Sequence, residues 1–315
     1  MFSISDRVTV IDGGFSTQLM LNVGVQIDGD PLWSARFNSV QPDAVVKSHL
    51  DFLENGAEII LTNTYQASVE GYTKHLNINR EESIDLIKKT VKLAHNARDN
   101  FMQINSNTEL PLIFASIGPY GAHLHDGSEY TGSYADTVSV ETIKNWHKVR
   151  INACIEAGVD GLAIETIPCQ MEAEAVVDMI LDEHPDMKFW VSFQCKDGNS
   201  LAHGEKFADA VDSIFTRVAA RNKKNLVAVG INCINSEFVS QLLRSIKVEV
   251  PLVVYPNSGE TYNVETGWQG KNSYTPLEDF VHEWIELGAR FIGGCCRIDA
   301  SDIKKIKEKV QELKK

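Results

Sequence analysis

The chain has 315 residues, of which 43% are apolar and 23% are charged, a composition typical of a folded globular protein. Its formal net charge of −13 argues against nucleic-acid binding, which needs a basic surface to meet phosphate. No apolar run approaches the ~18 residues of a membrane-spanning helix, and the N-terminus lacks a basic start followed by an apolar stretch. We therefore expect a cytoplasmic protein without a secretory signal, whose six cysteines are reduced thiols.

Short β-branched segments alternate along the chain with longer segments of helical periodicity. Several of the short segments are almost continuously apolar, as expected of strands buried on both faces of a parallel sheet. The eight candidate strands are residues 8–11, 58–62, 112–116, 161–165, 189–193, 226–231, 252–255 and 290–293.

The segments between these strands predict helices. Residues 277–285 place apolar side chains at positions i, i+3, i+4, i+7 and i+8, the stripe of a helix that lies on a core. Similar patterns predict helices at residues 42–55, 83–100, 140–157, 171–183, 206–221, 237–245 and 303–313. Eight strands alternating with eight helices predict an α/β fold, a single (β/α)8 TIM barrel spanning residues 1–315, and a doubly wound open sheet is the alternative.

Polar and glycine-rich residues collect directly after the predicted strands, at the end of a barrel where active sites form. One long loop, residues 120–134, follows the third strand and is expected to lie over this end. Three cysteines are placed there as well: Cys233 ends the sixth strand, and Cys295 and Cys296 end the eighth. In a barrel these two strand ends share one rim, separated by a single strand.

Three thiolates leave one position open around a tetrahedral Zn²⁺, which is the arrangement of a catalytic site. The glycines before Cys295 and Cys296 let the backbone bend so that both sulfurs can face one centre. The alternative is that Cys233 is a core residue and the adjacent pair is incidental or forms a strained disulfide. We interpret Cys154, Cys169 and Cys195 as structural, and give His123 and His125 no ligand role.

An open position on zinc can activate a substrate thiol or a water molecule. Because three sulfur ligands make zinc a weaker Lewis acid, the pattern favours alkylation of a thiolate over hydrolysis. Asp12 and Glu165 lie at strand ends and can pair with a substrate ammonium group, or can instead accept backbone hydrogen bonds within the barrel. Backbone N–H groups near Gly13 can receive a carboxylate.

Aromatic residues near the same strand ends can face a cationic methyl donor through their rings. Trp33, Tyr65 and Tyr130 are the candidates, although each can instead be an ordinary core or loop residue, a reading that is stronger for the two tyrosines than for Trp33. The glycine-rich segments do not form a G-x-G-x-x-G motif that opens a helix, so no dinucleotide site is predicted.

Eight motifs in order resemble the homocysteine S-methyltransferase family over nearly the whole chain. GINC paired with GGCCR is the most specific of them. The motifs are DGGFSTQL (12–19), PLWSA (31–35), TNTYQAS (62–68), GPYGA (118–122), ETIP (165–168), GINC (230–233), YPNSGE (255–260) and GGCCR (293–297).

The resemblance implies a (β/α)8 barrel in which Cys233, Cys295 and Cys296 bind zinc. It implies that homocysteine binds zinc through sulfur and binds Asp12 and Glu165 through its amino group, and that the product is methionine. The donor methyl would lie near Trp33. The other motif positions that the resemblance places around the substrates are Gly13, Thr62, Gln66, Thr166 and Asn232.

Within the family, this chain resembles the short type that uses S-methylmethionine and sometimes S-adenosylmethionine. Betaine-using relatives carry a longer C-terminal oligomerisation extension, and cobalamin-dependent methionine synthases add folate and cobalamin domains. The chain ends soon after its last predicted helix, which leads us to expect a monomer. Two departures from the family pattern, Asn63 and Cys195, bear on the donor preference, and a selenol acceptor such as selenocysteine stays open.

A second hypothesis comes from a different functional class. The chain can be a zinc- or redox-responsive binding protein that keeps the barrel but does not turn over. The presence of both carboxylates and all three cysteines argues against this hypothesis. Binding of zinc and homocysteine without transfer from any donor would support it.

Overall fold

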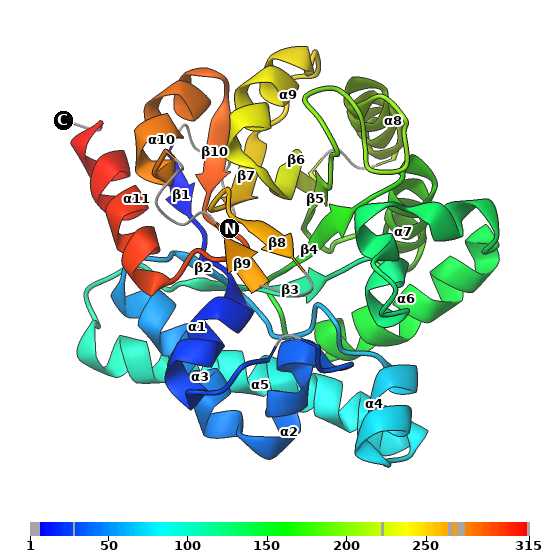
Figure 1. The fold of residues 1–315 in the computed structure, drawn as a ribbon, viewed down its shortest axis with the longest axis vertical. Coiled ribbons are helices and arrows are strands. Elements are labelled where there is room, and N and C mark those ends of the chain that lie inside the picture. Colours follow the sequence, from blue (N-terminus) through cyan, green and yellow to red (C-terminus); the bar gives the residue numbers. More distant parts are fainter. Residues whose placement is uncertain (1–6, 28, 222–223, 264–266, 270–274, 314–315) are drawn as a thin grey trace.

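The computed structural model describes residues 7–27, 29–221, 224–263, 267–269 and 275–313, and its main feature is a ring of parallel strands surrounded by helices (Figure 1). Eight strands form one sheet in the order β1-β10-β7-β6-β5-β4-β3-β2. They are β1 (Thr9–Val10), β2 (Ile59–Leu61), β3 (Leu112–Ile117), β4 (Gly161–Ile167), β5 (Phe189–Phe193), β6 (Leu226–Asn235), β7 (Leu252–Asn257) and β10 (Ala289–Ile292). Each of the eight predicted strands is confirmed.

The sheet closes on itself between its first and last strands. Ile11 forms a parallel bridge with Ile59, and the N–H of Asp12 donates to the carbonyl of Ile59 at 3.0 Å. The N–H of Glu58 donates to the carbonyl of Val10 at 2.8 Å on the other side of the bridge. This closure confirms the (β/α)8 barrel and removes the open-sheet alternative.

Large apolar side chains fill the inside of the barrel, and a second apolar layer lies between the strands and the helices. Inside, the ring of Phe114 stacks on Trp190 with ring centroids 4.7 Å apart. Gly161 makes room for this stack, because a Cβ at that position would lie 2.6 Å from the Phe114 ring. The strands are therefore apolar on both faces, which explains their continuous apolar sequences.

Helices on the outside of the barrel bury one apolar face each. In α10 (Leu277–Glu286), Leu277, Val281 and Trp284 are buried at the predicted helical spacing. The other main helices are α3 (Pro42–Glu54), α5 (Arg80–Ile104), α6 (Val140–Glu156), α7 (Gln170–Glu183), α8 (Phe207–Ala219), α9 (Val239–Ser245) and α11 (Ala300–Glu312). All eight predicted helices are present, with ends that differ by a few residues. None of the described helices has the length and apolar character needed to cross a membrane.

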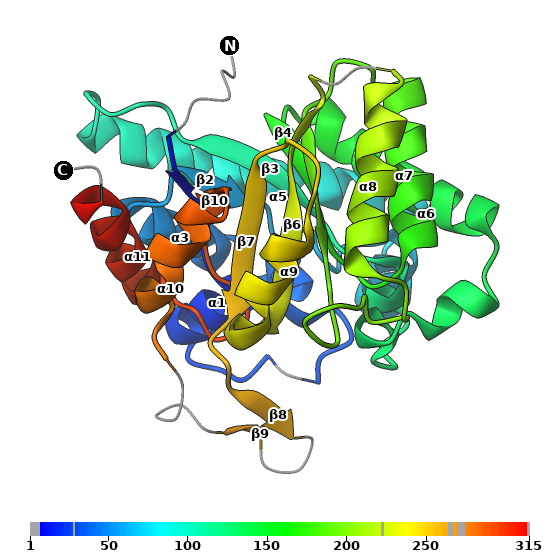
Figure 2. The same cartoon turned by 90° about the horizontal axis from the view of Figure 1, so that it is seen from above.

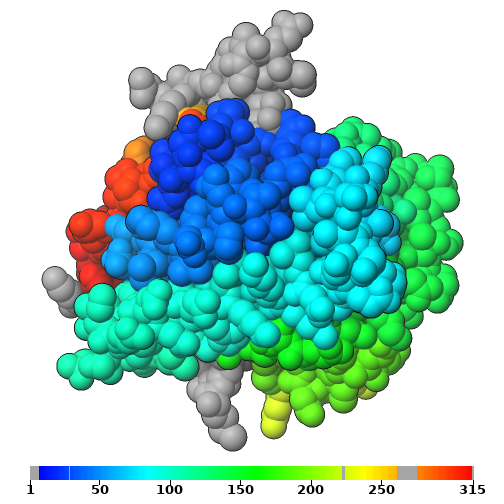
Figure 3. Space-filling model, turned by 90° about the horizontal axis from the view of Figure 1, so that it is seen from below, coloured from blue at the N-terminus to red at the C-terminus, as the bar shows by residue number. Residues whose placement is uncertain are grey.

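The N-terminal third of the chain covers one side of the barrel. Figure 3 shows this face in blue to cyan, with the red helix α11 at its edge. The N-terminal third of the chain contains three helices that we did not predict, α1 (Phe15–Val23), α2 (Phe37–Val40) and α4 (Val69–Leu76). They were missed because they are short and bury few residues, so they carry little apolar periodicity.

A β-hairpin that we did not predict follows β7. Strands β8 (Thr261–Asn263) and β9 (Gly267–Gln269) pair antiparallel, and Figure 2 shows them beyond the carboxyl end of β7. The loop over residues 120–134 contains three short 3₁₀ helices, from Tyr120 to His123, from Ser128 to Tyr130 and from Ser133 to Asp136. Both insertions lie at the end of the barrel where the polar residues gather.

Candidate metal centre and active site

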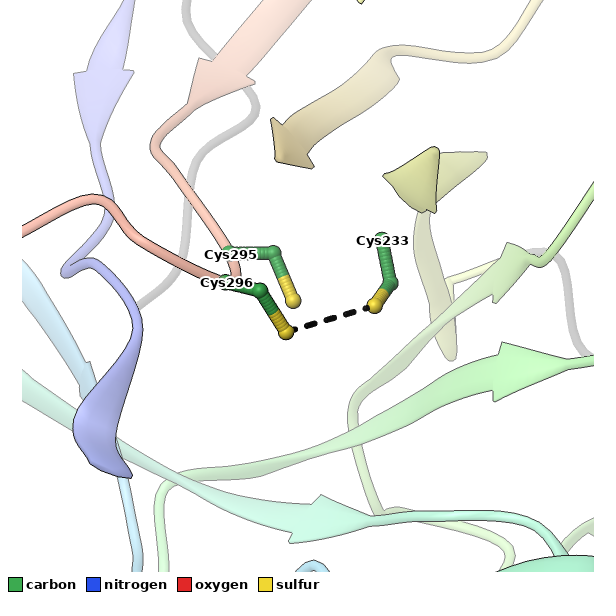
Figure 4. A group of neighbouring side chains, drawn as sticks. All are labelled: Cys233, Cys295 and Cys296. Atoms are coloured by element: carbon green, nitrogen blue, oxygen red, sulfur yellow. Dashed lines mark hydrogen bonds between the residues drawn. The ribbon is translucent and has the colours of Figure 1, made fainter. Parts of the chain in front are cut away.

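The three predicted cysteines meet at the carboxyl ends of β6 and β10. Their sulfur atoms all lie within 4.8 Å of one another, and the sulfurs of Cys233 and Cys296 are 3.7 Å apart (Figure 4). All six cysteines of the chain are free thiols, so the adjacent pair Cys295 and Cys296 forms no disulfide. Cys154, Cys169 and Cys195 are buried elsewhere and belong to no such group among the described residues.

Backbone bonds fix the turn that carries Cys295 and Cys296 against β7. The N–H of Cys295 donates to the carbonyl of Pro256 at 2.8 Å, and the N–H of Cys296 donates to the side chain of Asn257 at 3.0 Å. Gly14 packs directly on this turn, because a Cβ there would lie 2.4 Å from the carbonyl oxygen of Cys295. The two glycines after β1 are thus needed to bring the first and last strand ends together.

The sulfur cluster is suited to a zinc ion. Four-coordinate zinc with Zn–S bonds of about 2.3 Å separates its sulfur ligands by about 3.8 Å, close to the observed separation of Cys233 and Cys296. The neighbouring sulfurs of Cys233 and Cys296, together with burial, raise the pKa of the Cys295 thiol well above its usual value. Three crowded thiols therefore need a cation before they can all ionise.

One pocket, with about 700 Å³ of empty volume, extends from the sulfur cluster. It brings together nine of the eleven residues that the sequence predicted for the site. They are Gly13, Trp33, Thr62, Gln66, Glu165, Thr166, Cys233, Cys295 and Cys296. The pocket also contains Tyr65 and Tyr130, which the sequence proposed as aromatic faces, and no Lys, Arg or His side chain is among its described lining residues.

Asp12 and Asn232 do not line the pocket and lie directly behind it. The carboxylate of Asp12 accepts the N–H of Leu61 at 2.8 Å, which fixes it between β1 and β2. Burial raises the pKa of Asp12 well above its usual value, and the nearby charge of Glu165 adds to this effect. The two carboxyl groups are thus close enough to influence each other.

The side chain of Asn232 holds the backbone of Thr166. Its amide oxygen accepts the Thr166 N–H at 2.7 Å and the Ser192 hydroxyl at 2.8 Å, while its amide nitrogen donates to the Thr166 hydroxyl at 2.7 Å. Thr166 has φ of +58° and Cys233 has φ of +54°, a region that residues other than glycine rarely adopt. Strained backbone of this kind is common at functional sites, where surrounding contacts maintain it.

Glu165 is the acidic side chain of the pocket, and the residues around it were not predicted. Its carboxylate accepts a hydrogen bond from Ser116, which ends the third predicted strand. Burial raises the pKa of Glu165 to about 7, against the opposing effect of hydrogen bonds from Ser116 and Tyr255. The available signal for Ser116 and Tyr255 was their position, because each places a polar group at the end of a predicted strand.

The loop of residues 120–134, which the sequence placed over this end of the barrel, contributes to the pocket. Tyr130 lines it, and the amide nitrogen of Gln66 donates to the carbonyl of Ala122 at 2.8 Å and lies 3.0 Å from His125. His123 instead stacks on Trp146, 4.8 Å away between ring centroids. Among the described residues, neither histidine belongs to the sulfur cluster.

Comparisons with known proteins give one family. A family model described as homocysteine S-methyltransferase matches residues 9–310. The chain is 53% identical over 311 residues to a betaine-homocysteine S-methyltransferase from Drosophila melanogaster, a match that covers 96% of this chain and 93% of that protein. It is 40% identical over 313 residues to homocysteine S-methyltransferase 1 from Brassica oleracea var. italica, covering 94% of this chain and 91% of that protein.

A solved structure is similar over almost the same span. The metallated form of the homocysteine methyltransferase MmuM from Escherichia coli is 35% identical to the chain and covers 96% of each, with a TM-score of 0.82. The family model and the relatives give the family that the motifs indicated, and the solved structure has the same fold. The chain belongs to the homocysteine S-methyltransferase family.

Proposed function

We propose that the protein transfers a methyl group from a sulfonium donor, S-methylmethionine or S-adenosylmethionine, to homocysteine and so forms methionine. The observation that carries this proposal is the sulfur cluster of Cys233, Cys295 and Cys296, which opens into the pocket that contains Glu165. These cysteines would hold Zn²⁺, which when bound favours ionisation of a substrate thiol at neutral pH. A thiolate attacks a methyl sulfonium far better than a thiol does.

The chain's own residues would bind and orient homocysteine. Its ammonium group would pair with Glu165, supported from behind by Asp12, since an ammonium ion stabilises two adjacent carboxyl groups in their ionised form. Its carboxylate would bind at the start of α1, where the N-cap residue is Gly14, which has no side chain to cap the first N–H groups. The substrate sulfur would then face the cysteines.

The transfer needs few groups besides those that position the two sulfurs. The homocysteine sulfur forms the new S–CH₃ bond as the donor S–CH₃ bond breaks, and the bonding electron pair leaves with the donor sulfur as a neutral thioether. The thiol proton is lost to solvent before attack. Because the leaving group is neutral, no side chain has to protonate it, and alignment of the two substrates supplies much of the rate.

The charge of the pocket favours a sulfonium donor. S-methylmethionine and S-adenosylmethionine carry a net positive charge at neutral pH, whereas betaine is a neutral zwitterion. The described lining combines Glu165 and three cysteines with aromatic rings at Trp33, Tyr65 and Tyr130, and contains no Lys, Arg or His. Aromatic faces and negative charge both attract a net cation.

Betaine is the second candidate donor. The Drosophila relative has betaine in its name, and because this chain covers 93% of it, chain length does not separate the two donor types here. A quaternary ammonium group can also lie on aromatic faces. A selenol acceptor, a monomeric state, a cytoplasmic location and one domain over residues 1–315 all stay predictions.

The test is methionine formation from homocysteine by zinc-loaded protein with S-methylmethionine, S-adenosylmethionine and betaine in parallel. Turnover with a sulfonium donor and none with betaine is the expected result. Turnover with betaine alone would replace the proposed donor and keep the proposed acceptor. Bound zinc and homocysteine with no turnover from any donor would support the binding-protein hypothesis instead.

A further inference from the structure

One wall of the pocket is a short segment that crosses from α1 towards α3. It contains the 3₁₀ helix η1 (Trp33–Arg36) and begins at Asp30, whose side chain binds Arg36 and accepts the N–H of Leu32 at 2.8 Å. Trp33 is the residue of this segment that enters the pocket together with Ser34. Its position therefore sets part of the shape of the pocket.

Trp33 is held in an unusual conformation. Its φ is +46°, in the left-handed region that favours glycine, and its indole nitrogen is buried without a hydrogen-bond partner in the described structure. The indole therefore gains no polar contact of its own that would fix the side chain. A bulky residue keeps such a backbone only where neighbouring contacts determine it.

Asn63, directly after β2, provides those contacts through Ser34. Its amide nitrogen donates to the Ser34 carbonyl at 2.8 Å, and its amide oxygen accepts the Ser34 hydroxyl at 2.6 Å. Asn63 thus binds both the backbone and the side chain of the residue next to Trp33. It is 3% exposed, so water does not compete for these bonds.

A second asparagine completes the attachment. The amide nitrogen of Asn63 also donates to Asn38 at 2.9 Å, and the amide nitrogen of Asn38 donates to the carbonyl of Asn63 at 3.0 Å and to the hydroxyl of Tyr72 at 3.0 Å. Asn38 is completely buried. Both polar atoms of the Asn63 side chain and the backbone carbonyl oxygen of Asn63 therefore form hydrogen bonds that attach the segment to the barrel.

We infer that Asn63 is a positioning residue for the methyl donor, which it serves by holding Trp33 at the pocket wall. The inference rests on the proposed function in one respect, that the donor lies against Trp33. It predicts a selective effect, because the side-chain hydrogen bonds of Asn63 go to Ser34 and Asn38 and none of them reaches Glu165 or the three cysteines. Asn63 also lines the pocket, so the Trp33→Ala background separates a direct contact with the donor from positioning through Trp33. A purely structural role for Asn63 would predict loss of stability without such selectivity.

The kinetic test uses Asn63→Ala and measures both Michaelis constants. We expect KM for the sulfonium donor to rise about tenfold, while KM for homocysteine and the zinc content stay within twofold of wild type. In a Trp33→Ala background, the same substitution should change the donor KM less than twofold, because the residue through which it acts is gone. Equal changes in both KM values, or additive effects in the double variant, would overturn the inference.

A matched control and a milder variant separate positioning from folding. Asn225 is also completely buried, and its amide nitrogen donates to Pro185 and Met187 at the opposite end of the barrel, so Asn225→Ala should lower stability without changing the donor KM. Ser34→Ala removes only the hydroxyl bond to Asn63 and should give a smaller rise in the donor KM. If Asn63→Ala does not fold, Ser34→Ala carries the test, and an unchanged donor KM in that variant would overturn the inference.

A spectroscopic measurement tests the inference independently of turnover. The indole N–H resonance of Trp33 is identified by its absence in Trp33→Phe. In Asn63→Ala this resonance should shift or broaden, while those of Trp146, Trp190 and Trp284 should not. If wild type fails to turn over but this selective shift occurs, the proposed function fails and the positioning role stands. An unchanged Trp33 resonance would overturn the positioning role whatever the activity.

Discussion

Replacing Asn232 with alanine should lower both stability and activity, because Asn232 supports Thr166 from outside the pocket. The substitution removes three buried hydrogen bonds, two to Thr166 and one to Ser192. The Ser192 hydroxyl keeps its bond to Tyr255 at 2.6 Å, but the buried N–H of Thr166 loses its acceptor. An unsatisfied buried donor costs about 1–3 kcal/mol, and each lost neutral bond costs about 1 kcal/mol.

The expected loss is therefore about 3 kcal/mol in the free energy of unfolding, which urea titration followed by circular dichroism would measure. In a thermal scan this corresponds to a fall of roughly 6 °C in Tm. Thr166 also keeps its left-handed backbone only with this support, so Glu165 beside it should move. We expect kcat/KM for homocysteine to fall at least tenfold.

Ser192→Ala is the graded comparison, since it removes one of the three bonds of Asn232 together with the bond between Ser192 and Tyr255, and leaves Thr166 supported. Its loss should be about 2 kcal/mol, with a smaller change in kcat/KM than Asn232→Ala because the Thr166 N–H keeps its acceptor. The reasoning would be refuted if Asn232→Ala kept wild-type stability while KM for homocysteine rose. That result would make Asn232 a direct substrate contact, as the family resemblance implied.

Three further substitutions test other parts of the structure. Cys295→Ser should lose both zinc, measured by atomic absorption, and activity, while its circular dichroism spectrum stays unchanged. Stoichiometric zinc with normal turnover in this variant would remove the metal-site argument. Glu165→Gln should raise KM for homocysteine roughly 10–100-fold through loss of the charged partner of the ammonium group, and an unchanged value would place that group elsewhere. Burial lowers the pKa of His49 to about 3, so the unfolded chain takes up a proton below about pH 6.5 while the native His49 stays neutral. The contribution of His49 to stability should therefore fall by about 2 kcal/mol between pH 7 and pH 5, opposite in sign to the contribution of Glu165, whose raised pKa stabilises the native state as the pH falls. In urea titrations the stability of wild type minus that of His49→Leu should fall by this amount over the same range, and a constant difference would show that His49 does not contribute.

The order of elements could be predicted from the sequence because it depends on local periodicity. Parallel strands buried on both faces are continuously apolar, and helices on a core carry an apolar stripe, so the eight strands and eight helices were found. The same periodicity carried no signal for α1, whose few buried residues do not form a long stripe. The hairpin of β8 and β9 was missed for a related reason, since it is short and projects from the barrel.

The sequence by itself determined the barrel and the residue types of the site, because reactive groups follow strands and a barrel brings strand ends to one rim. This was sufficient to predict that Cys233 would meet Cys295 and Cys296. Only the tertiary structure decided which polar groups face the pocket and which support it from behind, because that depends on side-chain direction and hydrogen-bond partners. Asn232 lies behind the pocket, whereas Asn63 lines it while its side chain binds Ser34 and Asn38. Asn232 was predicted at the substrate and lies behind Thr166. Asn63 was noted only as a departure from the family, but it holds the segment of Trp33 through hydrogen bonds to residues that lie 25 to 29 positions away in sequence.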